Sequence, residues 1–123
     1  IKLNYDIIPY AVFTYPQIAA VGITEEQASE KHKLLIGKAK YSDVAKGEAM
    51  AEHDGFAKAI VDHDTGKILG FHIIGPYAPI LIQEVINAMS LGGEIAYLAK
   101  GMHIHPALPE LILRTFGNLK HPE

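Results

Sequence analysis

The residues most able to do chemistry lie in one short segment, Met102–Glu110, near the C-terminal end of the 123-residue chain. Proline at position 106 disfavours helical angles at His105, which is therefore expected in an extended turn. A helix is expected to begin just beyond, with Glu110 in its first turn, so the two side chains can meet. A carboxylate that accepts a hydrogen bond from one imidazole nitrogen fixes the tautomer and makes the ring more basic. The other nitrogen could then take a proton from a substrate.

The same residues allow two other interpretations. In a purely structural one, Glu110 is favoured in the first helical turn by the helix dipole, and His105 is an ordinary turn residue. In the other, the spacing of His103, His105, Glu110 and Gly117 is similar to the first metal motif of the cupin barrels, where two imidazoles and a carboxylate bind a divalent ion. Cupin ligands lie on strands, whereas the flanking residues here predict helices, so we expect no metal site.

The chain contains seven histidines, and those outside this segment have ordinary interpretations. His72 falls inside a strand pattern and is predicted to be partly buried with its hydrogen bonds satisfied. The others lie in polar turns or near the chain end and are predicted to be solvated: His32, His53, His63 and His121.

The elements expected to position Met102–Glu110 are strands first and helices last. β-Branched and aromatic residues predict five strands: Tyr10–Thr14, Ile18–Gly22, Lys33–Tyr41, Phe56–Asp62 and Ile68–Ile74. A short helix is expected after the second strand, with Thr24 as N-cap, Gln27 in the capping-box position and an end near Lys31. Ser42–Ala51 is expected to be a loop.

Three helices are predicted to follow the strands: Ile80–Leu91, Glu94–Ala99 and Pro109–Phe116, the last with Gly117 as its C-terminal cap. The resulting order is β-β-α-β-β-β followed by three helices. Because the turn residues His63–Lys67 favour a hairpin, we expect an α+β fold with a mainly antiparallel sheet and the helices packed on it. Residues 1–123 are expected to form a single domain.

The composition excludes several classes of function. The chain has 11 basic and 14 acidic residues, so there is no basic excess for binding nucleic acid. No apolar run approaches the roughly 20 residues that a membrane helix needs. There are no cysteines, which excludes a redox thiol within these residues. This absence fits a reducing compartment, and we expect a cytoplasmic protein.

Several motifs, in order along the chain, resemble the C-terminal interface domain of the pyridine nucleotide–disulfide oxidoreductases. His105–Glu110 is similar to the His-Pro-Thr-x-x-Glu segment of that family, and Pro9–Gly22 is similar to its first two strands. Asp54–Lys58 and Ile68–Pro76 are similar to its hairpin. The resemblance extends from about residue 8 to residue 119 and is greatest to the dihydrolipoyl dehydrogenases.

The resemblance implies a role for each residue of the segment. His105 would be the acid–base residue that acts on the dithiol and disulfide, and Glu110 would orient it. The His105 carbonyl would approach the flavin and His105-Pro106 would be a cis peptide, so His105 and Pro106 would be the cofactor-binding residues. FAD and NAD would belong to the full-length parent, an NAD-dependent oxidoreductase. The isolated chain, without cysteines or nucleotide motifs, is expected to be inactive and to hold no cofactor.

The resemblance also implies partners. The domain would form a homodimer and supply its histidine to the partner subunit's active site. The domain would be a fragment of a larger flavoenzyme, in which FAD and NAD domains precede it. A lipoyl-bearing protein would be a further partner, whereas binding to nucleic acid or to a membrane is not expected. The apolar face of Ile80–Leu91 fits burial against a second copy, or burial entirely within the domain. A stand-alone dimerisation module without catalysis is the alternative.

The chain departs from the pattern of the family beside the histidine. Ala107 replaces the usual Thr, and Pro109 replaces a usual Ser. The helix therefore lacks a hydroxyl cap, for which the fixed φ of Pro109 partly substitutes. These differences affect which substrate is expected more than they affect the resemblance to the family.

Overall fold

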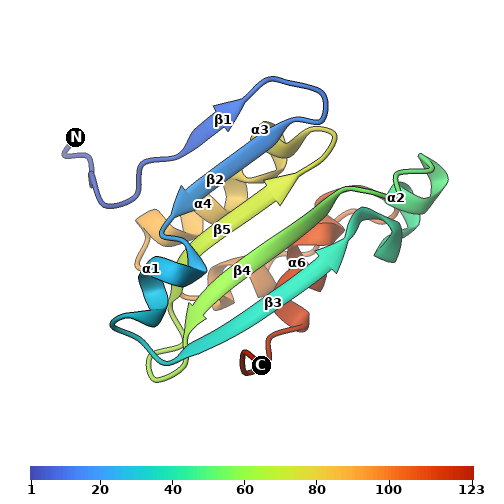
Figure 1. Cartoon of the computed structure of the whole chain (residues 1–123). Helices are drawn as coiled ribbons and strands as arrows, with labels where there is room; N and C mark the ends of the chain where they lie inside the picture. The colour runs from blue at the N-terminus through green and yellow to red at the C-terminus, as the bar shows by residue number, and fades with distance from the viewer.

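A five-stranded antiparallel sheet organises the chain, and the computed structural model describes all residues, 1–123 (Figure 1). The strands are β1 (Tyr10–Val12), β2 (Ile18–Gly22), β3 (Leu34–Lys40), β4 (Phe56–Asp62) and β5 (Ile68–Ile74). Their spatial order is β1-β2-β5-β4-β3, with every neighbouring pair antiparallel. The α+β class predicted from the sequence is confirmed.

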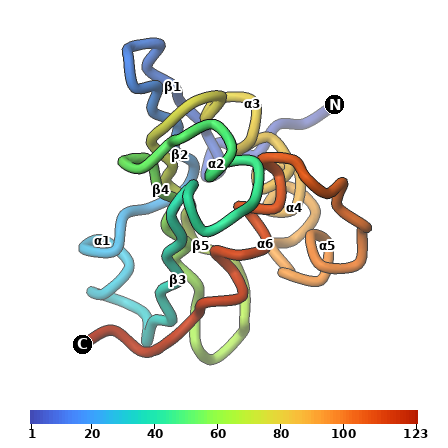
Figure 2. The backbone as a smooth tube through the Cα atoms, turned by 90° about the vertical axis from the view of Figure 1, so that its right-hand side faces the viewer, coloured from blue at the N-terminus to red at the C-terminus, as the bar shows by residue number.

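The helices divide unequally between the two faces of this sheet. They are α1 (Glu25–Ser29), the 3-10 turn η1 (Tyr41–Asp43), α2 (Ala45–Ala49), α3 (Ala78–Leu81), α4 (Gln83–Ser90), α5 (Ala96–Ala99) and α6 (Glu110–Gly117). The side view shows the late helices on one side of the sheet and α1 on the other (Figure 2). No helix has both the length and the apolar character needed to cross a membrane.

Alternate residues of β4 supply the cores on the two sides of the sheet. Ala57, Ala59 and Val61 are buried in the main core beneath α3, α4 and α6. Ile60 points the other way, into a small cluster with Ala28 of α1 and two residues of β3. This is the period-two alternation of a strand that is covered on both faces.

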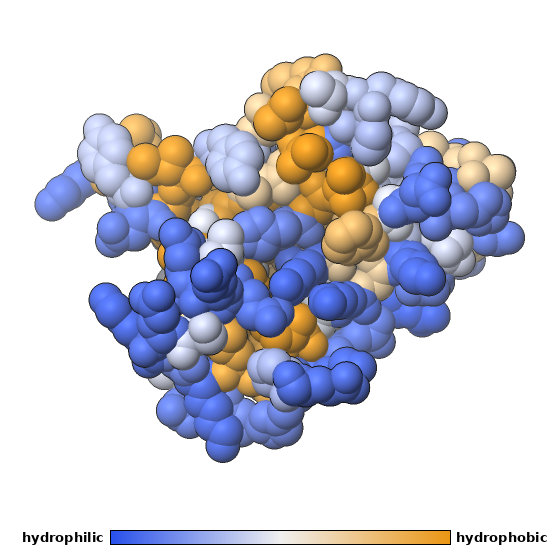
Figure 3. Space-filling view, viewed as in Figure 1, coloured by the Kyte–Doolittle hydropathy of each residue, from blue (hydrophilic) through white to orange (hydrophobic).

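The face that carries α1 is only partly covered (Figure 3). Hydrophobic side chains gather on part of this face (Figure 3). Tyr10 and Phe56 line a hollow together with Glu25 of α1 and are 61% and 44% exposed. α1 itself begins as the sequence predicted. The Thr24 hydroxyl accepts a hydrogen bond from Gln27 N at 3.2 Å, and the Gln27 side chain accepts one from Thr24 N at 3.0 Å. This is the predicted capping box.

The prediction of a loop over Ser42–Ala51 is wrong, because this stretch contains most of η1 and all of α2. Burial of Tyr41 explains the difference. Its ring is fully buried and its hydroxyl donates to the Pro76 carbonyl at 2.7 Å. Gly47 of α2 packs so closely on Tyr41 that a Cβ at residue 47 would lie 1.9 Å from the Tyr41 carbonyl oxygen. These are tertiary contacts that local helix propensity does not show.

The late helices differ from expectation in their boundaries. The single helix expected over Ile80–Leu91 is divided into α3 and α4 at Ile82. There the Ile82 carbonyl accepts from Val85 N at 3.0 Å, an i to i+3 contact that tightens the chain. Gly117 is the last residue of α6 rather than its cap. Asn118 is the cap, and its amide donates to the Lys38 carbonyl at 2.8 Å.

Candidate active site

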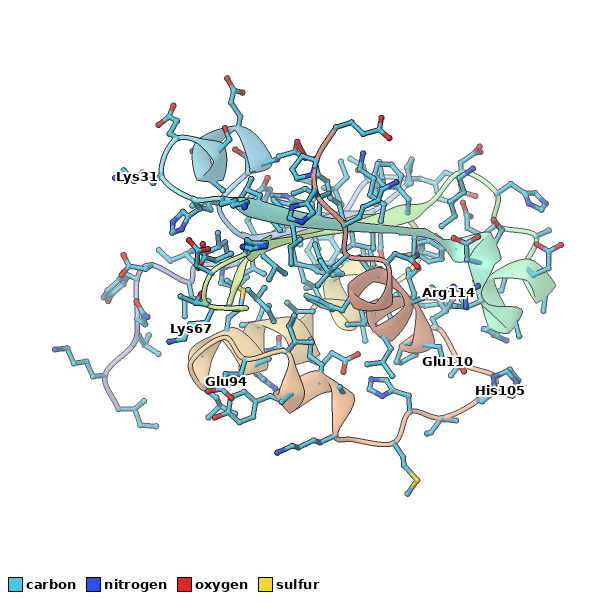
Figure 4. The ribbon with its side chains drawn as sticks, turned by 90° about the horizontal axis from the view of Figure 1, so that it is seen from below. Lys31, Lys67, Glu94, His105, Glu110 and Arg114 are labelled. Carbon is cyan, nitrogen blue, oxygen red and sulfur yellow. The ribbon has the colours of Figure 1, made fainter.

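The segment between α5 and α6 presents His105 on the surface of the molecule. The His105 side chain is 67% exposed, and Glu110 is the first residue of α6 with a side chain that is 25% exposed. His105-Pro106 is a cis peptide, as the family resemblance implied. His105 and Glu110 lie at the same end of α6 in the side-chain view (Figure 4).

The imidazole of His105 pairs with the carboxylate of Glu110. His105 Nδ1 lies 2.8 Å from Glu110 Oε1 and 3.0 Å from Oε2. Glu110 Oε2 also accepts a hydrogen bond from the Ala107 backbone N at 3.2 Å, so the carboxylate is held from both sides. With a proton on Nδ1 to donate, neutral His105 leaves Nε2 as an unprotonated acceptor.

Electrostatics around Glu110 favour its charged form. The hydrogen bond from His105, followed by that from the Ala107 N–H, lowers the pKa of the Glu110 carboxyl below its usual range. Positive charge on His105 and His103 acts in the same direction. Glu110 is therefore an anion at neutral pH and can stabilise a protonated His105. No group of the chain is hydrogen-bonded to His105 Nε2, which faces the surroundings.

His103 belongs to a different pair. Its Nε2 lies 2.9 Å from Glu84 Oε2 in α4, and its Nδ1 lies 3.1 Å from the Gly101 carbonyl oxygen. Sequence reasoning missed Glu84, although one acidic residue in the otherwise uncharged stretch 80–91 was a signal for a partner.

The cupin-like alternative does not fit this arrangement. Its three ligands would have to converge from neighbouring strands, whereas His103 and His105 lie in a loop and Glu110 lies in a helix. His103 and His105 turn to different carboxylates. No group of three or more His, Asp or Glu side chains comes together in a geometry that could hold a metal ion.

A hollow of about 630 Å³ lies beside the pair. One wall is formed by Asp43–Ala45 and the other by α6, including Arg114, with His103 and His105 also at the lining. Arg114 makes no ion pair shorter than 4.0 Å. The sequence reasoning did not single out Asp43 or Arg114. Arg114 follows Glu110 by four residues in α6 and therefore lies one turn further along the same face of the helix.

The remaining histidines are largely structural. His72 is half-buried and its Nε2 lies 3.1 Å from the Ile23 carbonyl, as predicted. His53 and His121 are exposed, also as predicted. His32 is exposed, as predicted, and its Nδ1 in addition lies 3.1 Å from the carboxylate of Asp62, which is only 6% exposed. This long-range contact has no local signal in the sequence.

His105 and Pro106 could contact only one edge of a flavin ring. The His105 carbonyl accepts no hydrogen bond within the chain, and His105 is an exposed residue, so a ring could approach it. A nucleotide cradle is lacking: in the turn after β5, a Cβ at Gly75 would be 2.5 Å from the Tyr41 ring, so this glycine accommodates Tyr41. His105 and Pro106 could contact a flavin, but they could not hold its phosphates.

These features agree with the sequence relationships of the chain. Residues 8–115 match the sequence model of the pyridine nucleotide-disulphide oxidoreductase dimerisation domain. The chain belongs to this family. The fold is also that of the HOCl-induced flavoprotein disulfide reductase RclA from Escherichia coli. The TM-score is 0.84, with 28% identity over 91% of this chain and 26% of that one.

Relatives of this domain occur in oxidoreductases with different names. Mycothione reductase of Mycobacterium tuberculosis is 47% identical over 98% of this chain and 27% of its own length. Chloroplastic dihydrolipoyl dehydrogenase 2 of Arabidopsis thaliana is 42% identical over 96% of this chain and 22% of its own length. The chain thus spans about a quarter of these relatives.

Proposed function

We propose that this domain serves a flavin-dependent disulfide oxidoreductase in which His105, oriented by Glu110, takes up and returns a proton during thiol–disulfide exchange. The observation that carries the proposal is the 2.8 Å contact of His105 Nδ1 with Glu110 Oε1. This contact leaves Nε2 exposed and without a partner. A base held in one tautomer by a fixed carboxylate is the arrangement that general acid–base catalysis requires.

The proton balance follows from thiol chemistry. A dithiol with pKa values near 8.5 is mostly protonated at neutral pH, whereas the attacking species is the thiolate. His105 Nε2 accepts the thiol proton as that sulfur attacks one sulfur of the enzyme disulfide; a mixed disulfide forms, the enzyme S–S bond breaks, and the second enzyme sulfur leaves as a thiolate. Glu110 stabilises the resulting imidazolium. When the exchange runs in the opposite direction, His105 returns this proton to the leaving thiolate.

The remaining components lie outside these 123 residues. The chain has no cysteine, so the redox disulfide belongs to another part of the parent protein or to its partner subunit. When bound in the parent, FAD and NAD would supply the oxidation and reduction chemistry. The His105 carbonyl and Pro106 would lie at the flavin edge. The preceding FAD and NAD domains would then be the neighbours of this domain.

Self-association is the second part of the proposal. The family is named for dimerisation, and two large apolar side chains along the α3–α4 region are exposed: Ile80 is 71% exposed and Leu91 is 65% exposed. We place the contact with a second copy at this helical surface. In such a homodimer, His105 of one subunit would serve the disulfide of the other.

Two substrates are compatible with this mechanism. The motifs beside His105 favour a lipoyl group, carried by a lipoyl-bearing protein, as in the dihydrolipoyl dehydrogenases that the chain resembles. The mycothione reductase of M. tuberculosis has the higher identity, 47% against 42%, and favours mycothione as the second candidate. Steady-state assays of the parent protein with both disulfides distinguish them by the ratio of kcat/KM.

A mixed-dimer experiment tests whether the histidine is supplied across subunits. One variant of the full-length oxidoreductase lacks the redox cysteines, and the other carries His105→Gln. Each homodimer is expected to be inactive in dithiol oxidation. In the mixed dimer, one active site combines the intact cysteines of one subunit with the intact His105 of the other, so activity is expected to return. Absence of activity in purified mixed dimers would contradict the supply of His105 in trans.

A further inference from the structure

The segment that carries His105 has few contacts with the rest of the domain. Residues 101–106 make no backbone–backbone hydrogen bond to any part of the chain. Met102 and Ile104, on either side of His103, are 101% and 78% exposed. Within residues 101–106, His103 alone is not exposed, and its side chain is only 11% accessible. The position of the segment therefore depends on side-chain contacts of its two histidines.

The contact of His103 is made to a rigid part of the fold. Glu84 Oε2 lies 2.9 Å from His103 Nε2, and Glu84 belongs to the first turn of α4. The neighbouring residue Val85 is fully buried, and Ala88 and Met89 are buried one turn later, so α4 is packed into the main core. A side chain on a packed helix is positioned more accurately than one on a loop.

Both nitrogens of the His103 ring face acceptors. Nε2 faces the Glu84 carboxylate, and Nδ1 lies 3.1 Å from the Gly101 carbonyl oxygen. The imidazolium form donates to both, and a contact with an ionised partner is stronger than one between neutral groups. The charged groups around His103 are Glu84 from α4, Glu110 and Arg114 from α6, Asp43 from η1 and its neighbour His105.

We propose that Glu84 and His103 form a positioning pair that fixes the His105 segment to α4, so that His105 Nε2 is presented in one place. This inference rests on the proposed function of His105. It assigns to Glu84 a role that involves no contact with the reacting groups. Because this is the one side-chain hydrogen bond between α4 and the segment, the loss of Glu84 leaves the His105–Glu110 contact as the remaining side-chain hydrogen bond from residues 101–106 to a helix.

The first test measures the order of the segment without any activity. Amide ¹⁵N relaxation is recorded on the 123-residue chain for the wild type and for Glu84→Ala, Glu84→Gln and Glu94→Ala. In Glu84→Ala, the order parameter at Ile104 is expected to fall from about 0.85 to below about 0.6. Glu84→Gln keeps an oxygen acceptor and is expected to retain most of the order. Glu94→Ala is the control, because the hydrogen bonds and ion pair of His103 involve Gly101 and Glu84 and not Glu94.

The second test measures the consequence in the full-length oxidoreductase. Glu84→Ala is expected to slow the dithiol half-reaction by up to about 100-fold, the cost of a misplacement near 1 Å, with reduction of the flavin by the nicotinamide unchanged. Glu84→Gln is expected to restore much of the rate. A general structural defect would lower the rates of both half-reactions together.

Three outcomes would overturn the positioning role. These are unchanged order at residues 102–106 in Glu84→Ala, equal loss in Glu94→Ala, or no rescue by Glu84→Gln. Should Glu84→Ala fail to fold, His103→Gln provides the same comparison, with His53→Gln as control. The proposed function fails separately: if His105→Gln is fully active, the acid–base role is wrong, while the relaxation experiment still decides the Glu84–His103 pair.

Discussion

Gly37 in β3 lies directly against Thr115 in α6, so closely that a Cβ atom at residue 37 would be 2.2 Å from the Thr115 carbonyl oxygen. Thr115 is fully buried, and its hydroxyl donates to the Leu111 carbonyl one turn earlier at 2.7 Å. α6 begins with Glu110, so this close approach helps to set the position of the candidate catalytic carboxylate. Only glycine allows it, since any side chain would displace the helix from the sheet.

Gly37→Ala is therefore expected to destabilise the domain. Overpacking of a filled core costs about 1–3 kcal/mol in the free energy of unfolding. Urea unfolding monitored by circular dichroism measures this. Gly117→Ala, at the end of α6, is the control, because nothing lies within 4 Å of a Cβ at Gly117. A stability equal to wild type in Gly37→Ala would show that α6 can move without cost.

The catalytic proposal predicts an order of effects in the full-length oxidoreductase. His105→Gln removes the base and is expected to slow the dithiol half-reaction by about 10² to 10⁴, while reduction of the flavin by the nicotinamide is unchanged. Glu110→Gln should cost less, because the amide still accepts from His105 Nδ1. His103→Gln should also cost less than His105→Gln, because its role is positional.

Stopped-flow kinetics of the two half-reactions measure these effects, with His53→Gln as an exposed control. The proposal predicts that His53→Gln behaves as wild type in both half-reactions. If His103→Gln were as damaging as His105→Gln, the assignment of His105 as the base would be wrong.

Asp62 is expected to make stability depend on pH. Its carboxylate accepts from the Thr65 hydroxyl at 2.6 Å and the Thr65 N–H at 2.9 Å, and it contacts His32 Nδ1 at 3.1 Å. The Thr65 hydroxyl, together with the Thr65 N–H and His32, lowers the pKa of Asp62 below its usual value of 3.8. The folded state thus binds the proton more weakly than the unfolded state does. Stabilisation is complete above the unfolded pKa and is lost as the pH falls through the folded pKa.

Asp62→Asn should therefore be less stable than wild type at neutral pH, and the difference should shrink below about pH 4. Unfolding by urea at neutral pH and near pH 3 measures this. Asp54→Asn, at an exposed carboxylate, should leave the pH profile of stability as in wild type. A constant difference between wild type and Asp62→Asn at both pH values would contradict the linkage.

Ile80→Glu is expected to weaken self-association without loss of the fold. The Ile80 side chain is 71% exposed at α3, so a charge costs little in the monomer but would be buried in a dimer contact. Sedimentation velocity over a concentration series measures the change. Ile8→Glu is the matched control, since Ile8 is 60% exposed near the N-terminus. Equal dimer content in wild type and Ile80→Glu would place the interface elsewhere.

The sequence by itself determined the features that depend on local patterns. The alternation in Phe56–Asp62 and the hairpin residues after it gave β4 and β5 with their observed bounds. Thr24 and Gln27 gave the start of α1, because a capping box is formed by residues three apart. The pairing of His105 with Glu110 was also accessible, because Pro106 keeps His105 out of a helix and the next helix begins only five residues after His105.

Only the tertiary structure decided the features that join distant parts of the chain. The Tyr41 ring, just before the unexpected η1 and α2, is buried against Gly75, and its hydroxyl donates to the Pro76 carbonyl 35 residues away. The pairs His32–Asp62 and Glu84–His103 are separated by 30 and 19 residues. Hydrogen bonds over such separations form only when the sheet and helices have packed, so no periodicity or local motif encodes them.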